Sequence, residues 1–186
     1  MILQIIQFYN SQQEFKQLHL NLKQIQCPHC KAIGFLILHG FLYGYNESSD
    51  EPKNIRGHRI FCSNRKNRNG CGKTFSILFA GLLKNHTVTA RSFWNFFKKL
   101  LKHINIFRTF KITQPSFSIS SAYRLFKKFS FSQSKIRTNL IQKKPPPAIK
   151  NTIAPIIETI MHTKHAFNKN HNPIESFQNH FQTSFL

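Results

Sequence analysis

Carboxylate side chains are scarce in this sequence. The 186 residues include 27 Lys and Arg but only six Asp and Glu, which gives a formal net charge of +21. Asp50 is the single aspartate, and the glutamates are scattered along the chain. Metal-dependent phosphoryl transfer needs clustered carboxylates to hold Mg²⁺, and a Ser-His-Asp set could be assembled only with Asp50. The sequence therefore predicts a protein that is not an enzyme, and in particular not a nuclease.

Long apolar runs and phosphate-binding loops are absent as well. No apolar stretch reaches the roughly 18 residues expected of a membrane-spanning helix. The first residues, Met1–Gln7, carry no basic charge and are interrupted by glutamine, unlike a secretory signal. No glycine-rich loop for a nucleotide is found. We therefore expect a cytoplasmic protein, associated with the nucleoid if it is bacterial, that has neither a membrane partner nor a small-molecule substrate.

Cysteine is limited to four residues, which form two pairs. Cys27 and Cys30 lie in a tight Cys-x-x-Cys turn, whereas eight residues separate Cys62 from Cys71. Glycines on both sides of Cys71 leave room for backbone amides to turn toward the sulfur. Pairs of this kind in an intracellular protein are more typical of metal ligands than of disulfides. We predict one structural Zn²⁺, bound in a closed tetrahedral site by Cys27, Cys30, Cys62 and Cys71.

Other interpretations of these residues stay open. Cys27 and Cys30 could form a redox pair, and the thiols could also be free and buried. His29 lies within the first pair and could compete as a ligand, but we expect its ring to point outward. His39 and His58 are interpreted as ordinary polar residues.

The positive charge is the main indication of a partner. A strongly basic protein favours polyanions, of which nucleic acid is the simplest. The loop of residues 63–70 carries Arg65, Lys66 and Arg68 close to the second cysteine pair. Arg and Lys side chains bind phosphates and base edges. These three residues are therefore candidate nucleic-acid ligands, with a solvated loop as the alternative.

The part of the chain around the cysteines has the pattern of a small β domain. We predict strands over residues 33–45, 56–61 and 74–79, with an exposed polar loop over residues 46–54. The order of cysteine pair, two strands, cysteine pair and strand is that of a zinc ribbon, which we assign to residues 27–82. Residues 1–26 are predicted to lead into it with an amphipathic helix, whose apolar positions are Phe8, Phe15, Leu18 and Leu22.

Residues 85–142 show helical periodicity instead. Helices are predicted over residues 90–104, 106–111 and 119–129, with Pro115 in the turn and one more basic turn within 132–140. The second and third helices have the lengths of a helix-turn-helix, with a basic three-helix bundle as the alternative. The candidate nucleic-acid ligands of the third helix are Ser120 and Ser121, nearest the bases, and Arg124, Lys127 and Lys128, at phosphates.

Proline marks the end of this region. Three consecutive prolines cannot continue a helix, so residues 143–148 are predicted to be a linker. Residues 149–186 are predicted to be a C-terminal helical tail, with one helix over 149–167. Phenylalanines at four-residue spacing indicate a last helix that packs back: Phe177, Phe181 and Phe185. The predicted fold class is α+β, a small N-terminal β zinc ribbon followed by an all-α helix-turn-helix-like region.

The motifs resemble those of a known family. Cys-Pro-x-Cys, a long strand, Arg-x-x-Cys, Cys-Gly-x-Thr-Phe and then a helix pair resemble the N-terminal zinc ribbon plus helix-turn-helix of insertion-sequence transposases. The segments 61–64 and 71–75 are also similar to small phage zinc-finger transcription activators. The resemblance covers about residues 25–130 and implies zinc at the four cysteines. Transposase chemistry is not carried over, because the catalytic carboxylates are missing.

Taken with the charge, this resemblance indicates a function. The expected protein is a non-catalytic zinc-ribbon protein that binds double-stranded DNA, related to the DNA-binding subunits of mobile elements. The alternative is a zinc-stabilised module that binds RNA or a protein and has no DNA specificity.

Overall fold

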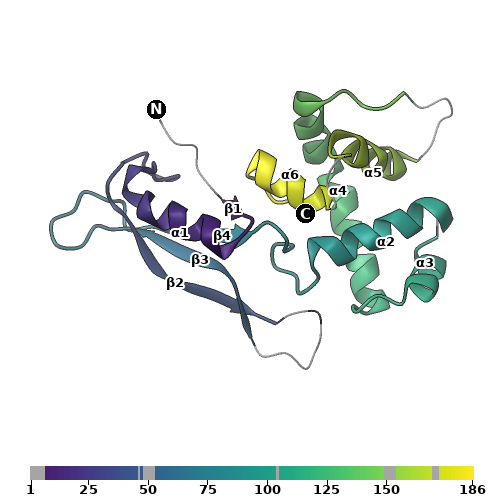
Figure 1. Cartoon of the computed structure of the whole chain (residues 1–186), viewed down its shortest axis with the longest axis horizontal. Helices are drawn as coiled ribbons and strands as arrows, with labels where there is room; N and C mark the ends of the chain where they lie inside the picture. Colours follow the sequence, from purple (N-terminus) through teal and green to yellow (C-terminus); the bar gives the residue numbers. More distant parts are fainter. Residues whose placement is uncertain (1–6, 46, 48–52, 104, 149–153, 169–171) are drawn as a thin grey trace.

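The computed structural model describes residues 7–45, 47, 53–103, 105–148, 154–168 and 172–186. A four-stranded sheet with one covering helix lies beside a bundle of helices (Figure 1). This arrangement confirms the predicted α+β class. Most of the predicted polar loop over residues 46–54 and the start of the predicted helix over 149–167 fall outside the described residues.

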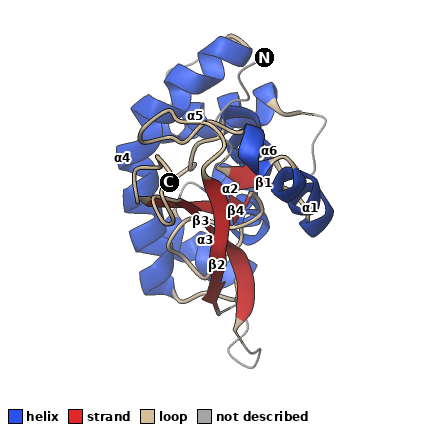
Figure 2. Cartoon of the chain, turned by 90° about the vertical axis from the view of Figure 1, so that its left-hand side faces the viewer, coloured by secondary structure: helices blue, strands red, loops and turns tan. Residues whose placement is uncertain are grey.

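The sheet has the strand order β1-β4-β3-β2. Its strands are β1 (Phe8–Tyr9), β2 (Leu36–Gly44), β3 (Asn54–Cys62) and β4 (Thr74–Phe79). β2 to β4 form an antiparallel meander, and the β2–β3 hairpin projects past the helix that covers the sheet (Figures 1 and 2). The three strands predicted from the sequence are therefore present. β1 pairs in parallel with β4, so the prediction of Phe8 in a helix is wrong, because long-range pairing decides the conformation of this short segment.

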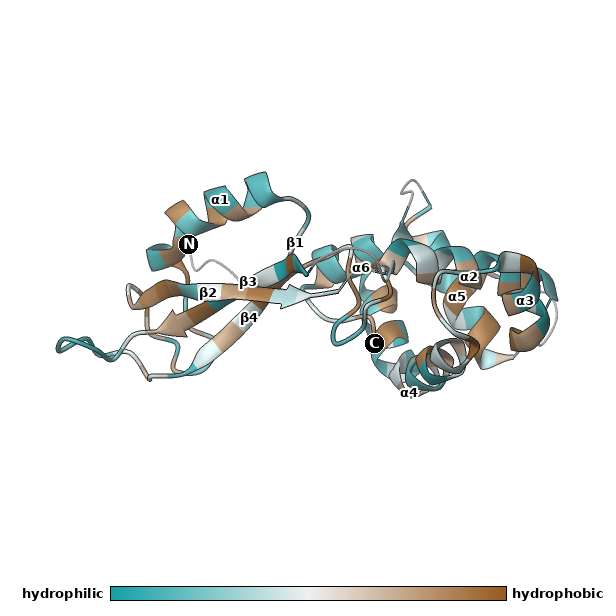
Figure 3. Ribbon diagram, turned by 90° about the horizontal axis from the view of Figure 1, so that it is seen from below, coloured by the Kyte–Doolittle hydropathy of each residue, from teal (hydrophilic) through white to brown (hydrophobic). Residues whose placement is uncertain are grey.

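Helix α1 (Gln12–Leu20) lies along one face of the sheet (Figures 1 and 3). Ser11 caps it by accepting a hydrogen bond from the Glu14 amide at 3.1 Å. Phe15 and Leu18 are buried against the sheet, and a short 3₁₀ helix, η1 (Leu22–Gln24), follows. The predicted amphipathic helix is thus present, starting after Phe8.

His58 is not the ordinary polar residue that the sequence suggested. It lies on β3 beneath α1, where it is fully buried and its ring stacks on Phe15. Neither ring nitrogen has a hydrogen-bond partner among the residues that the structure describes. Burial lowers the pKa of His58, and the positive charge of His19 lowers it further. His58 is therefore a neutral aromatic member of the core.

The second part of the molecule consists of helices. They are α2 (Ala90–His103), α3 (Ile106–Thr113), α4 (Ile119–Lys143), α5 (Pro155–Ala166) and α6 (Pro173–Phe181). α2 and α3 agree with the predicted helices. The prediction that the third helix ends near Phe129 is wrong, because α4 runs without a break to Lys143. Buried residues continue along it at Ile136 and Leu140, and no glycine or proline interrupts it before Pro145.

Polar residues at the helix starts fix their boundaries. Thr89 caps α2, Asn105 caps α3 and Ser118 caps α4, each accepting from a backbone amide three residues later. Glu47, from the β2–β3 connection, also accepts from the Thr89 amide and from the hydroxyls of Ser92 (2.6 Å) and Ser116 (2.8 Å). One carboxylate therefore ties the hairpin to α2 and to the α3–α4 turn.

The helices share an aromatic core to which the C-terminal region contributes. Phe129 of α4 packs on Phe97 of α2, with ring centroids 4.6 Å apart, and on Phe185, at 5.7 Å. Ile160 of α5 and Phe177 of α6 are fully buried in the same cluster. The C-terminal helices therefore complete the bundle, as the phenylalanine spacing predicted for the last of them.

Two glutamines of the C-terminal segment join the bundle to the sheet. The buried Gln178 donates to the carbonyls of Ala80 (2.7 Å) and Leu82 (2.9 Å) and accepts from the Phe185 amide (3.1 Å). Gln182 accepts from the amide of Phe8 at 2.8 Å. These bonds supply partners to backbone groups that the sheet leaves unpaired.

Replacing Gln178 by leucine tests how much its hydrogen bonds contribute to stability. Gln178→Leu leaves the carbonyl of Ala80, the partly buried carbonyl of Leu82 and the amide of Phe185 without this partner. An unpaired buried group costs about 1–3 kcal/mol, so the two buried groups, at Ala80 and Phe185, should lower the free energy of unfolding in urea by about 2–6 kcal/mol. The exposed Gln142→Leu is the matched control. Equal stability of the two variants would contradict the role of Gln178.

Candidate metal centre and basic surfaces

The structure brings the four cysteines together. All four sulfur atoms lie within 4.8 Å of one another. The sulfurs of Cys27 and Cys71 are 3.8 Å apart, and those of Cys30 and Cys62 are 3.7 Å apart. Four thiolates at about 2.3 Å from one tetrahedral ion would be separated by about 3.8 Å. The group could therefore hold a single metal ion, with the four ligands that the sequence predicted.

The first pair is positioned by a tight backbone turn. The Cys27 amide donates to the Ala32 carbonyl at 2.9 Å, and the Lys31 amide donates to the Cys27 carbonyl at 3.0 Å. Lys31 has a φ of 62°, which closes the turn. His29 is exposed, and its ring lies 6.5 Å from that of Phe75. These contacts aim both sulfurs at one point and leave His29 outside the sulfur group.

The second cysteine pair is brought together by the loop of residues 63–70, whose two ends lie side by side. The Gly70 amide donates to the Ser63 carbonyl at 3.1 Å, which brings the chain back beside Cys62. The Cys71 amide then donates to the Cys62 sulfur at 3.4 Å, and the Gly72 amide to the Cys62 carbonyl at 2.9 Å. Gly72 has a φ of 70°, which favours glycine. The eight intervening residues thus leave the sulfur geometry intact.

The environments of the thiols differ. Cys27 and Cys62 are buried, whereas Cys30 is exposed at the edge of the group. A hydrogen bond with the backbone of Ala32 lowers the pKa of Cys30 to about 7, and burial raises the pKa of Cys62 to about 12. A bound cation would stabilise the thiolate form of each residue.

Gly70 offers a test of the loop that closes the second pair. A methyl group on Gly70 would overlap the backbone of Ser63 and Cys62. Gly70→Ala should therefore displace Cys71 and cost about 1–3 kcal/mol, as overpacking does. We expect a lower melting temperature and a lower metal content. Gly81→Ala is the control, since its methyl would make only ordinary contacts; a Gly70→Ala variant that matches it would refute the assignment.

The basic loop, residues 63–70, lies at the end of the sheet that is farther from the bundle of helices α2 to α6 (Figure 1). Arg65, Lys66 and Arg68 are all exposed, and the hydrophilic loop forms one tip of the molecule (Figure 3). The Arg65 guanidinium lies 5.2 Å from the centre of the Phe61 ring, a distance typical of a cation–π contact. The loop is thus separated from the candidate residues of α4.

The predicted ligands of α4 are not equivalent. Ser120, Arg124, Lys127 and Lys128 are exposed. Ser121 is half-buried, its amide donates to the Ser118 hydroxyl at 3.2 Å, and its hydroxyl contacts the same group at 3.0 Å. Ser121 therefore belongs to the helix cap. The exposed positions 120, 124 and 127 follow one face of the helix.

The structure adds a cationic cluster that no sequence motif indicated. The Lys128 ammonium lies 3.0 Å from Nε2 of His86. Burial lowers the pKa of His86, and the positive charges of Lys128, Arg124 and Arg56 lower it further. Arg56 comes from β3 and His86 from the connection to α2. Three segments that are remote in sequence meet here, so local patterns could not reveal the cluster.

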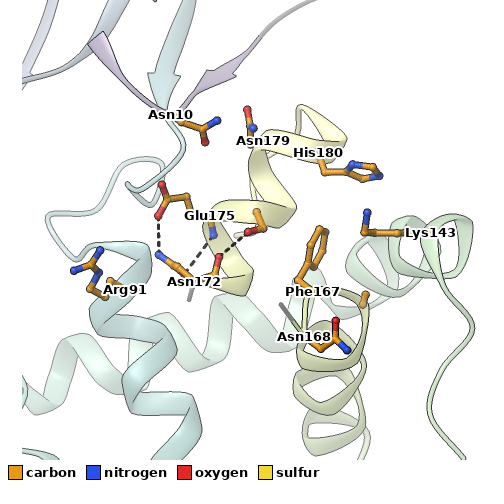
Figure 4. A pocket seen from close by; sticks show the side chains of 11 residues that line it. Asn10, Arg91, Lys143, Phe167, Asn168, Asn172, Glu175, Asn179 and His180 are labelled. Atoms are coloured by element: carbon orange, nitrogen blue, oxygen red, sulfur yellow. Dashed lines mark hydrogen bonds between the residues drawn. The ribbon is translucent and has the colours of Figure 1, made fainter. Parts of the chain in front are cut away.

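A second polar region lines a pocket of about 620 Å³. It lies between α6, the ends of α4 and α5, and Asn10 (Figure 4). Asn172 donates to the Glu175 carboxylate at 3.1 Å and caps α6, while Lys143 lies over the Phe167 ring at 5.0 Å. These polar groups bond to one another and hold the helices together.

Comparisons of the chain with protein-family models, curated proteins and solved structures find no match. The likeness to insertion-sequence transposases therefore rests on the motifs alone. Across the parts of the chain that the structure describes, no helix combines the length and apolar character needed to cross a membrane.

Proposed function

We propose that this chain is a non-catalytic zinc-ribbon protein that binds double-stranded DNA. The observation that carries the proposal is the convergence of Arg56, His86, Arg124 and Lys128 at one place on a chain of net charge +21. Clustered cations repel one another and are stabilised when a polyanion occupies the surface. Phosphates of nucleic acid supply that charge at regular spacing.

The metal has a structural role in this proposal. Four thiolates at tetrahedral spacing are typical of zinc or iron–sulfur sites, and a single ion at the observed sulfur separations fits zinc. With four protein ligands the ion has no position for a reactive water. Binding of the ion would instead contribute directly to the folding free energy of the ribbon.

Helix α4 supports the preference for duplex DNA. It begins after the α3–α4 turn and presents Ser120, Arg124 and Lys127 along one exposed face. A recognition helix in the major groove uses its first turns for base edges and neighbouring cations for phosphates. Ser120 is then nearest the bases, and Arg124 and Lys127 lie toward the backbone of the duplex.

Metal content tests the zinc assignment. We expect one zinc per chain by elemental analysis, and four thiols that react only after chelation. Cys30→Ser should unfold the ribbon, seen as lost strand signal in circular dichroism, since structural zinc contributes to folding free energy. His29→Ala is the control and should retain the metal. A metal-free protein with four reactive thiols would rule out the zinc ribbon.

Salt dependence tests the DNA assignment. Affinity for a blunt duplex should fall linearly in a log–log plot against salt, with a slope of about −0.9 for each phosphate neutralised. Lys127→Ala should leave the melting temperature unchanged and reduce the slope by about 1. Lys16→Ala on α1 is the matched control. Tighter binding of structured RNA than of duplex DNA in a competition assay would favour the RNA-binding alternative.

A further inference from the structure

A groove lies where the sheet meets the bundle, next to α4. Its volume is about 360 Å³, and it runs between the sheet and the segment that connects β4 to α2. We call it the junction groove. Leucine side chains form part of its lining, together with polar and aromatic residues that include Tyr43, Tyr45, Arg56, Lys84, Asn85 and His86.

Cations are held at the groove by the backbone. The Arg56 guanidinium donates to the Tyr45 carbonyl at 2.7 Å and to the His86 carbonyl. The Arg56 side chain is half-buried, and both terminal nitrogens of its guanidinium are hydrogen-bonded, so the group is fixed in place. Lys128 reaches the same region from α4, where it contacts His86. The carboxylate of Glu47, whose charge acts on Arg56, is hydrogen-bonded to the α2 cap and the α3–α4 turn.

Aromatic rings are exposed along the edge strand beside these cations. Phe41, Tyr43 and Tyr45 are 46%, 60% and 54% exposed. The rings of Phe41 and Tyr43 are 6.1 Å apart, and Lys53 lies 5.4 Å from the Tyr45 ring centre. Large apolar rings are seldom left in solvent in a row, and exposed patches of this kind mark binding sites.

We propose that the junction groove binds an unpaired stretch of DNA. Its phosphates would lie over Arg56, Lys84 and Lys128, and its bases would stack on Tyr43 and Tyr45. A cationic groove that carries exposed aromatic side chains is the arrangement with which proteins hold single strands. Since Lys128 also lies on α4, a duplex on that helix would be continuous with the strand in the groove. The preferred ligand is therefore a duplex with a single-stranded tail, an inference that rests on the proposed duplex binding.

Three labelled DNA probes test this proposal with the full-length, metal-loaded protein. They are a blunt duplex, the same duplex with a thymine tail at either end, and the tail alone, compared by fluorescence anisotropy. The tail should raise the affinity at least about fivefold, the smallest effect expected of one stacked base. Tyr45→Ala should reduce the gain, and the double variant with Tyr43→Ala should abolish it, while both leave blunt-duplex affinity unchanged. Tyr45→Phe should retain it, and Phe107→Ala, a 50% exposed ring on α3, is the control.

A second readout needs no variant. The fluorescence of 2-aminopurine placed in the tail should be quenched on binding to the wild-type protein, because the base stacks on an aromatic ring. A tail that gives neither higher affinity nor quenching overturns the proposal. So does polyglutamate that displaces the tail as well as a competing thymine strand does, since the groove would then bind acidic protein. If only the duplex assignment is wrong, the blunt duplex fails to bind while the free tail still binds in a Tyr45-dependent manner.

Discussion

The convergence of the four cysteine sulfurs is the constraint on which the N-terminal half of the fold depends. Cys27 and Cys30 precede β2, Cys62 ends β3 and Cys71 precedes β4, so one point joins the ends of all three strands. The core beneath α1 is a small cluster of buried side chains. Small domains of this kind generally need a metal or disulfides to be stable. A metal ion held by the four sulfurs would therefore stabilise the sheet, as the large aromatic core stabilises the helices.

A set of polar contacts then fixes the sheet against the bundle. Gln178 and Gln182 bind backbone groups next to β1 and β4, and Glu47 binds the starts of α2 and the α3–α4 turn. Because these bonds are directional, they hold the β2–β3 hairpin beside α4. That placement brings Arg56 of the sheet within reach of His86 and creates one basic surface to which both the sheet and the helices contribute.

The charged groups of this surface differ in their surroundings and in their hydrogen bonds. Burial and the positive charges of Lys128, Arg124 and Arg56 lower the pKa of His86, which favours its neutral form. Three carboxylates, those of Glu14, Glu47 and Glu175, take part in hydrogen bonds at helix starts. In the proposed complex, the cations of this surface would meet phosphates and the exposed rings beside β2 would meet bases.

The sequence by itself determined the elements with strong local signals. The four metal-ligand candidates followed from cysteine spacing, the three ribbon strands from apolar runs between turns, and α2 and α3 from periodicity and caps. Tertiary structure decided the rest. β1 exists only because it pairs with β4, His58 is buried only because α1 covers it, and the buried positions that continue along α4 are covered where α5 packs on it. The junction groove is formed by segments that are remote in sequence. Contacts between such segments produce no periodic pattern within any single segment, so the sequence alone could not reveal them.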